Sequence, residues 1–206
     1  MKKMLKGYFT HSTIIGLWVL FFIMLYICLT TQLLKNYYFL LILPVIIAPF
    51  YEWYVHKYVL HKQLPEKNNL LRRSLIRLHH DHHRHPQNYD LLFAPVWAVV
   101  IHLIQTYLLF ALITWSFSIA LVPFTSGVFY YLWYEWVHLG HHTPEYDFLT
   151  PFGKKLKRAH MWHHHHNENY YWGITNYLGD KILGTFKDKS ELEKSNTTKN
   201  IAGHTD

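Results

Sequence analysis

Histidine is the residue type in this chain whose number and spacing indicate chemistry. The chain has 18 histidines, and fifteen of them form four clusters. The clusters are HKYVLH at 56–61, HHDHHRH at 79–85, HLGHH at 138–142 and HMWHHHH at 160–166. Neutral imidazole is a common protein ligand for zinc, iron, copper and nickel. Four such clusters therefore predict a metal centre rather than a weakly basic, solvated surface.

Three of the clusters have the spacing of ligands on one helix face. Residues three or four positions apart lie one above the other on a helix. The sets with this spacing are His138 with His142, His79 with His82 and His83, and His160 with His163 and His164. Each set is therefore expected to point its imidazoles in one direction.

The first pair has a different spacing. His56 and His61 are five residues apart, which places them about 140° apart around a regular helix. Either the helix ends between them, or they bind different metals. With this pair the four sets contain ten imidazoles, about five for each of two metals, which is more than two tetrahedral zinc sites need. We predict five- or six-coordinate redox metals with a position left for oxygen.

Several further histidines do not belong to these ligand sets. Five of them lie within the four clusters: His80, His85, His141, His165 and His166. His80 and His141 each lie beside a proposed ligand, so a one-residue shift of the pattern would exchange them. The other three are expected to face solvent or lipid head groups. His102, deep in an apolar run, is expected to be a packing or tunnel-lining residue.

Three carboxylates are candidates for supporting the ligands. Glu52 lies four residues before His56, and Glu135 lies three residues before His138. Each is placed to accept the second ring N–H of a ligand histidine, which fixes the tautomer and raises the basicity of the ring. Charge inside an apolar run is costly, which favours such a role. Asp180 either does the same or caps a turn.

Four apolar runs must position the clusters. They cover residues 14–34, 37–60, 91–115 and 117–138, and a helix needs about 20 residues to cross a bilayer. The first run is too long for a secretory signal and no cleavage site follows it, so we expect a retained helix. Pro44 and Pro49 predict a kink in the second. A turn at Ser116 makes the third and fourth an antiparallel hairpin.

The distribution of charge predicts the topology. Net charge is +7, but the basic residues flank the apolar runs, which indicates membrane orientation and not nucleic-acid binding. Four spans place 19 of the 20 Lys and Arg residues on one side, and only Lys35 lies on the other. By the positive-inside rule that side, with both termini and the histidines, is the cytosol.

The expected architecture is all-α. We predict one membrane domain over residues 1–186, with four transmembrane helices and a cytosolic, histidine-rich helical cap. Residues 187–206 are polar and predicted to be disordered. The single cysteine, Cys28, excludes an internal disulfide.

The histidine sets resemble those of the fatty acid hydroxylase and sterol desaturase superfamily. The pattern His-x4-His, His-x2-His-His, His-x3-His, His-x2-His-His is matched in order by the ten proposed ligands. The stretch NENYYWGITNYLGDKILGT, from Asn167 to Thr185, is similar to the closing segment of bacterial fatty acid hydroxylase-like members. The resemblance covers residues 50–186, and the five extra histidines depart from it. His142 fits the pattern better than His141 because the sequence HTP follows it.

The resemblance implies a membrane di-iron enzyme that uses dioxygen to hydroxylate the acyl chain of a fatty acid or membrane lipid. Two iron ions are the implied cofactors, and zinc is able to replace them because it binds more tightly. No haem or flavin motif was found, so a separate electron donor is expected: a cytochrome b5, a ferredoxin or a reductase. The expected location is a bacterial inner membrane or the endoplasmic reticulum.

Two alternatives remain open from the sequence. The same chemistry could act on a sterol or a carotenoid, with desaturation as a possible outcome, and HKYVLH also resembles a carotenoid hydroxylase motif. The other alternative is a metal transporter or metal store. A transporter needs ionisable residues at mid-membrane depth, where only His102 lies, so this alternative is the weaker one.

Overall fold

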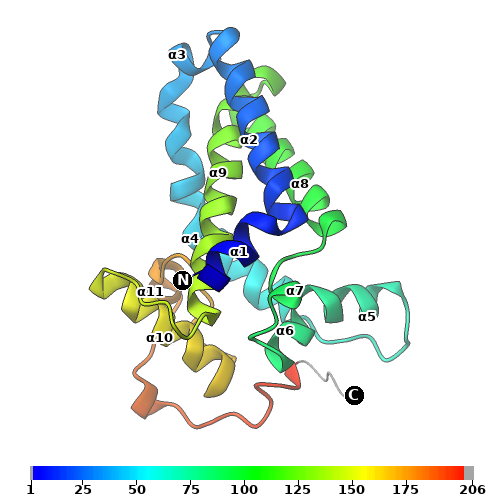
Figure 1. Ribbon diagram of the computed structural model, residues 1–206, viewed down its shortest axis with the longest axis vertical. Helices are drawn as coiled ribbons and strands as arrows, with labels where there is room; N and C mark the ends of the chain where they lie inside the picture. Colours follow the sequence, from blue (N-terminus) through cyan, green and yellow to red (C-terminus); the bar gives the residue numbers. More distant parts are fainter. Residues whose placement is uncertain (1, 202–206) are drawn as a thin grey trace. The chain divides into compact units, whose positions relative to one another are not determined.

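The computed structural model describes residues 2–201, and every regular element among them is helical (Figure 1). Contacts divide the chain into two compact units. We call residues 5–48 and 94–136 the membrane unit. The described parts of 1–4, 49–93 and 137–206 form the histidine unit. The first helix, α1 (Lys2–Thr10), contributes to both units.

The membrane unit is a bundle of long apolar helices. Its elements are α2 (Ser12–Thr30), α3 (Leu33–Tyr37), the 3-10 helix η1 (Tyr38–Ile42), the start of α4 (Leu43–Tyr54), α8 (Val96–Thr114) and most of α9 (Phe117–His142). The Tyr8 hydroxyl donates to the Leu132 carbonyl at 2.7 Å. Cys28, which is buried, lies 3.5 Å from the Thr125 hydroxyl. Both α1 and α2 therefore contact α9.

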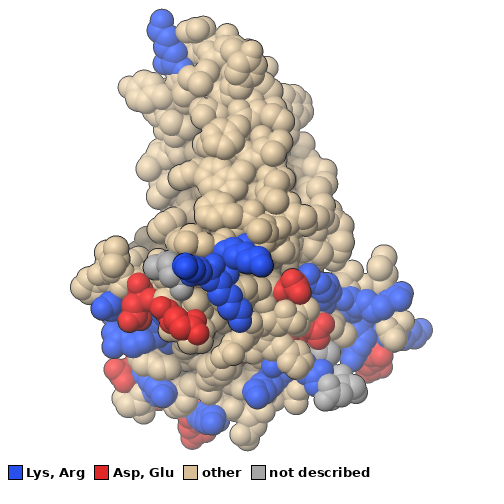
Figure 2. Space-filling view, in the orientation of Figure 1, with Lys and Arg blue, Asp and Glu red and all other residues tan. Residues whose placement is uncertain are grey.

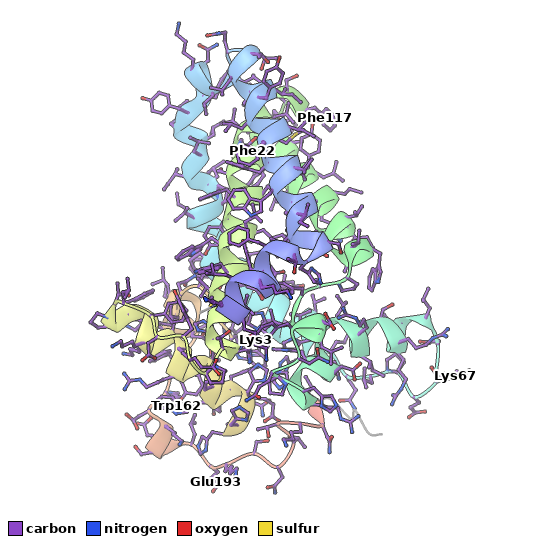
Figure 3. The ribbon with its side chains drawn as sticks, viewed as in Figure 1. Lys3, Phe22, Lys67, Phe117, Trp162 and Glu193 are labelled. Atoms are coloured by element: carbon purple, nitrogen blue, oxygen red, sulfur yellow. The ribbon has the colours of Figure 1, made fainter. Side chains whose placement is uncertain are left out.

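Four helical stretches are long and apolar enough to cross a membrane. They are Ser12–Thr30, Leu33–Leu60, Tyr89–Thr114 and Phe117–His142. The four predicted runs are thus confirmed as helices, with boundaries that differ by a few residues. Phe22 and Phe117 are 58% and 66% exposed and point away from the bundle in Figure 3. Over the helices of this unit, the face drawn in Figure 2 carries almost no charged side chains, as expected for a surface covered by lipid.

Local backbone chemistry sets the turns of the membrane unit. The predicted turn between the third and fourth runs is confirmed: Trp115 adopts a left-handed conformation with φ of 52°, and the Ser116 hydroxyl accepts the Ile119 N–H. On the second run, the irregular parts are the 3-10 helix η1, which ends just before Pro44, and the π-helix η2 (Val55–Leu60) at the end of the run. Pro49 lies inside α4.

The histidine unit is built from short helices. It contains the end of α4, the π-helix η2 (Val55–Leu60), α5 (Leu70–Leu75), the π-helix η3 (Ile76–His80), α6 (Asp81–Arg84), α7 (Tyr89–Leu92), the end of α9, α10 (Pro151–His165), α11 (Leu178–Ile182) and the 3-10 helix η4 (Lys189–Glu191). Lys and Arg side chains gather on the face of this unit shown in Figure 2.

The segment after residue 186 has defined contacts up to Ile201, which is 1% exposed. The Tyr171 hydroxyl donates to the Lys187 carbonyl at 3.0 Å, and the Ser195 N–H donates to the His166 carbonyl at 2.8 Å. Residues 202–206 of the tail predicted to be disordered lie outside the described residues.

Candidate metal centre

The ten proposed ligands come together in two groups of five inside the histidine unit. In each group one nitrogen from every imidazole lies within 4.8 Å of the others. The first group is His56, His61, His79, His83 and His163; the second is His82, His138, His142, His160 and His164. Since a metal–imidazole bond is about 2.0–2.1 Å long, two ligands on opposite sides of one ion lie about 4 Å apart. Each group therefore fits one metal ion.

A π-helical turn brings the first pair of histidines into one candidate metal-binding group. In η2 the His61 N–H donates to the His56 carbonyl at 3.1 Å, which is the i to i+5 bond of a π-helix. This wider turn brings residues five apart onto one side. The two histidines belong to the same group. The second alternative from the sequence, different metals for His56 and His61, does not match this geometry.

Two of the other ligand sets each lie on a continuous helical segment. His79 lies in the π-helix η3, and His82 and His83 lie in α6, which follows without a break. The set His160, His163 and His164 lies on α10. That helix begins at Pro151 after Thr150, whose hydroxyl accepts the Gly153 N–H at 3.0 Å; this is a favoured N-cap with proline in the first turn.

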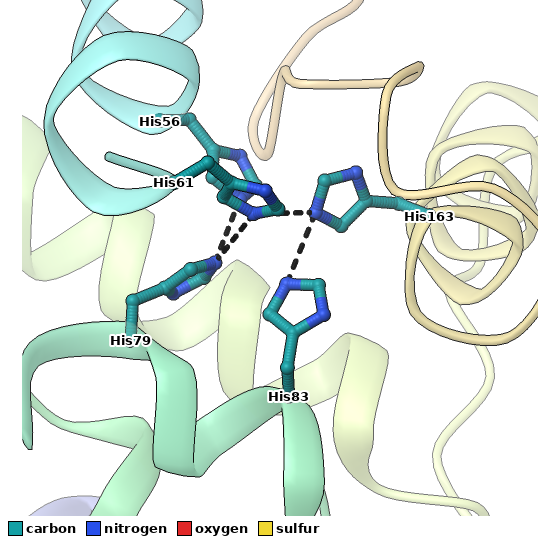
Figure 4. A group of neighbouring side chains, drawn as sticks. All are labelled: His56, His61, His79, His83 and His163. Atoms are coloured by element: carbon teal, nitrogen blue, oxygen red, sulfur yellow. Dashed lines mark hydrogen bonds between the residues drawn. The ribbon is translucent and has the colours of Figure 1, made fainter. Parts of the chain in front are cut away.

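The first group has imidazole nitrogens at very short separations (Figure 4). The Nε2 atom of His79 lies 3.0 Å from that of His56 and 3.1 Å from that of His61. The Nε2 atom of His163 lies 3.2 Å from those of His61 and His83. The rings therefore point their Nε2 atoms at one common position.

Backbone carbonyls determine the tautomers of three rings in this group. The Nδ1 atoms of His56, His83 and His163 lie 2.6, 2.9 and 2.8 Å from the carbonyls of Trp172, Thr198 and Tyr170, respectively. A carbonyl only accepts, so each Nδ1 carries the proton, and Nε2 of a neutral ring has a bare lone pair.

Two bare lone pairs that face each other repel unless a cation lies between them. His83 and His163 are in this situation, with Nε2 atoms 3.2 Å apart. Burial, followed by the charge of neighbouring histidines, lowers the pKa of both well below the usual value, so a proton on Nε2 is disfavoured. A metal cation satisfies this arrangement, and the donor set fits one.

The second group is equally buried. The Nε2 atom of His142 lies 3.1 Å from that of His82 and 2.8 Å from that of His160. Neither ring nitrogen of His164 has a hydrogen-bond partner among the described residues, although the side chain is 1% exposed. Burial lowers the pKa of His82 to about 3, with a smaller contribution from His56. Buried neutral rings without protein partners are suited to a metal ion.

Residues 170–175 form a segment without regular secondary structure that we call the carbonyl rack. Alternate residues of the rack present their carbonyls to histidine rings: Tyr170 to His163, Trp172 to His56 and Ile174 to His141. A residue that accepts a hydrogen bond through its backbone carbonyl can have any side chain. Sequence reasoning therefore did not identify this segment as part of the site. The signals in the sequence were the similarity of the stretch Asn167–Thr185 to the closing segment of family members and the pair of buried carboxylates that hold the rack.

Those carboxylates are Glu52 and Asp180. Glu52 accepts the N–H groups of Ile174 and Thr175, both at 3.0 Å. Asp180 accepts the N–H groups of Trp172 and Gly173 at 2.9 and 2.7 Å. Both carboxylates therefore act on the ligands through the backbone of the rack. A Cβ atom at Gly173 would lie 1.9 Å from the Asn176 carbonyl oxygen, so this position requires glycine.

The remaining predicted site residues lie as follows. Glu135 belongs to the membrane unit, where the Tyr131 side chain hydrogen-bonds to it. His141 is buried and its Nε2 lies 2.9 Å from the Ile174 carbonyl, so it donates there; this favours His142 as the ligand. His80 is buried but belongs to neither group. His85 and His165 are exposed.

His166 and His102 differ from simple surface residues. The Nε2 of His166 donates to the Leu192 carbonyl at 2.9 Å, and the side chain is half-buried. His102 is half-buried in the membrane unit, with its ring 5.1 Å from that of Tyr131. The expected role of His102, packing or tunnel lining, stays a prediction.

Comparisons with known proteins identify related sequences and one related structure. The family model described as fatty acid hydroxylase matches residues 40–185. The ceramide very long chain fatty acid hydroxylase SCS7 of Saccharomyces cerevisiae is 30% identical over 153 residues, which are 72% of this chain and 38% of that protein. The dihydroceramide fatty acyl 2-hydroxylase FAH2 of Arabidopsis thaliana is 32% identical over 149 residues, 70% of this chain and 59% of that protein.

The fold has a counterpart among solved structures. The structure titled full length scs7p, in which only the hydroxylase domain is visible, has a TM-score of 0.72 and 27% sequence identity; the match covers 84% of this chain and 65% of that one. The chain spans 38% to 61% of the length of the curated relatives it matches. The similarity to bacterial members that the sequence suggested stays a prediction.

Proposed function

The chain belongs to the fatty acid hydroxylase family, and on that premise we propose that it is an oxygen-dependent di-iron hydroxylase of lipid acyl chains. The observation that carries the proposal is the pair of buried five-histidine groups, in which the Nε2 atoms of His83 and His163 face each other at 3.2 Å. Imidazole-only sets with about five ligands each favour iron over tetrahedral zinc.

The residues of the chain hold and orient the metals. The ten proposed ligands are His56, His61, His79, His82, His83, His138, His142, His160, His163 and His164. Carbonyl acceptors on Nδ1 direct the Nε2 lone pairs of His56, His83 and His163 toward the first metal position. Nine of the ten ligands are buried, which keeps bulk water from the centre. When bound, two iron ions would supply the activation of dioxygen and the oxidation of a C–H bond.

The proposed reaction balances with an external reductant. One acyl C–H bond, one dioxygen, two electrons and two protons give one C–OH group and one water. The electrons come from a separate donor protein: a cytochrome b5, a ferredoxin or a reductase. The substrate is a lipid of the surrounding bilayer, and the names of the relatives favour carbon 2 of an amide-linked acyl chain.

A reconstitution experiment tests this function. The purified full chain, loaded with Fe²⁺ without oxygen and placed in lipid vesicles that contain a dihydroceramide, receives a reductant and ¹⁸O₂. We expect two metal ions per chain and a 2-hydroxylated acyl chain that contains one ¹⁸O atom, measured by mass spectrometry. A His83→Ala variant serves as the inactive control.

The alternatives predict other outcomes. A product with a new double bond and no ¹⁸O would indicate desaturation. If the protein oxidised only an added sterol or carotenoid, that molecule and not an acyl chain would be its substrate. Metal bound by the chain without any consumption of dioxygen would favour a metal store or carrier. Each of these results contradicts acyl-chain hydroxylation.

A further inference from the structure

The C-terminal strap, residues 187–201, follows the histidine unit through contacts spaced a few residues apart. The segment follows α11 and runs below α10 toward α6 in Figure 1. Its anchoring contacts are Tyr171 hydroxyl to Lys187 carbonyl, His166 Nε2 to Leu192 carbonyl, Asn167 side chain to Glu193 carbonyl and Ser195 N–H to His166 carbonyl. These bonds use mainly the backbone of the strap.

Near its end, the strap contacts a proposed metal ligand. The Thr198 carbonyl accepts the Nδ1–H of His83 at 2.9 Å, and His83 is 1% exposed. The contact joins residues 115 positions apart in the sequence. It supplies to His83 what the carbonyl rack supplies to His56 and His163: an acceptor that directs the Nε2 lone pair toward the first metal position.

Glu168 is the buried side chain that holds this end of the strap. It is 4% exposed, and its Oε1 accepts the hydroxyl of Ser195 at 2.9 Å and the hydroxyl of Thr197. Both hydroxyls lie within three residues of the Thr198 carbonyl. A carboxylate at this depth is costly unless it is hydrogen-bonded, so the two hydroxyls and Glu168 depend on one another.

We propose that Glu168 is a positioning residue for the first metal group, acting through Ser195, Thr197 and the Thr198 carbonyl on His83. The inference rests on the proposed function, because it takes His83 as a ligand. Of the strap contacts described above, the one made with a proposed ligand goes to His83, a member of the first group. Loss of the anchor therefore weakens the binding of one metal and leaves the other in place.

The test compares two substitutions of the same residue in the full chain. Glu168→Leu removes the acceptor oxygen, whereas Glu168→Gln retains a carbonyl oxygen that can accept both hydroxyls. Glu193→Leu is the matched control, since Glu193 is an exposed strap residue whose side chain points away from the unit in Figure 3. Each protein is loaded with Zn²⁺ alone and then challenged with a chelator, and the metal that remains per chain is measured.

We expect Glu168→Leu to release one of two metals about 10–100-fold more readily. Glu168→Gln and Glu193→Leu should keep both metals as the unaltered chain does. If Glu168→Leu does not fold, the double variant Ser195→Ala, Thr197→Val removes the same two hydrogen bonds and decides the question. Two firmly held metals in a folded variant that lacks the anchor would overturn the inference, as would equal loss of both metals.

The same measurement separates the inference from the proposed function. If the unaltered chain binds fewer than two metals, the di-metal centre itself is wrong and so is the positioning role. If it binds two and Glu168→Leu also holds two, only the role of the strap fails.

Discussion

At the scale of single residues, the centre depends on which ring nitrogen of each histidine carries its proton. Carbonyl acceptors place the proton on Nδ1 of His56, His83 and His163 and leave Nε2 for a metal. His141 has the opposite arrangement, because its Nε2 donates to the Ile174 carbonyl. Two adjacent histidines, His141 and His142, thus have different chemistry, and the difference lies in their hydrogen bonds rather than in their residue type.

Adjacent histidines on α10 test the ligand assignment. His164 is buried with no hydrogen-bond partner for either ring nitrogen among the described residues, whereas His165 is exposed. We expect His164→Ala to lose one metal and to reduce activity more than about 10-fold. Even the replacement of a residue that only supports a ligand typically lowers metal affinity or activity about 10–100-fold. His165→Ala should retain both metals and most activity. Metal analysis and turnover of the two purified variants provide the check, and equal losses would contradict the assignment.

The buried rings also predict a dependence of stability on pH. Burial lowers the pKa of His82 to about 3 in the folded chain, while a histidine in the unfolded chain has a pKa of about 6.5. Between these values the unfolded state binds more protons, so stability is present above about pH 6.5 and is lost as the pH falls toward 3. The thermal midpoint of metal-free protein should therefore decrease from pH 7.5 to pH 5. An unchanged or higher midpoint at pH 5 would contradict buried neutral histidines.

At the scale of elements, two structural features bring the rings together into the groups that could hold metal ions. The π-helix η2 changes the rotation per residue, so that His56 and His61 belong to one group. The carbonyl rack holds rings from three different segments with alternate carbonyls. Neither feature can be predicted from helical spacing. A π-turn has no clear sequence signature, and a backbone carbonyl acceptor has no sequence signature at all.

The carbonyl rack predicts that replacing Glu52, which is not a proposed ligand, lowers metal affinity. Replacing Glu52 by Ala leaves the buried N–H groups of Ile174 and Thr175 without their acceptor, and each such group costs about 1–3 kcal/mol. The rack should shift, and metal affinity should fall about 10–100-fold. Glu66→Ala, which changes an exposed glutamate of the same unit, is the matched control. Equal metal affinity in both variants would show that Glu52 has no positioning role.

At the scale of the whole molecule, periodicity and apolar runs predicted the all-helical architecture and the four long apolar helices. The ten histidines that match the pattern of the superfamily resemblance are those that form the two groups. The contacts of residues 187–201 could not be predicted from a polar, weakly patterned sequence. The hydroxyls of this segment bond to Glu168, and one of its carbonyls bonds to His83, only in the folded chain. Long-range backbone contacts are the part of the site that the sequence does not encode locally.

The orientation in the membrane remains a prediction, and it rests on charge. Of the 20 Lys and Arg residues, Lys35 alone lies near the connection at 31–32 between the first and second apolar helices. Translocating the other 19 would oppose the positive-inside rule. We therefore expect both termini and the histidine unit to lie in the cytosol, where a soluble electron donor has access to the centre.

Reporter fusions measure this orientation directly. An enzyme that is active only outside the cytosol should be silent when it is fused after Asp206, because four crossings return the chain to its starting side. The same reporter inserted after Thr31, in the short connection between α2 and α3, should be active. This second fusion controls for expression and membrane insertion. A strong external signal from the Asp206 fusion would mean an odd number of crossings or the reverse orientation, and in the reverse orientation the metal centre would have to receive its electrons from the other side of the membrane.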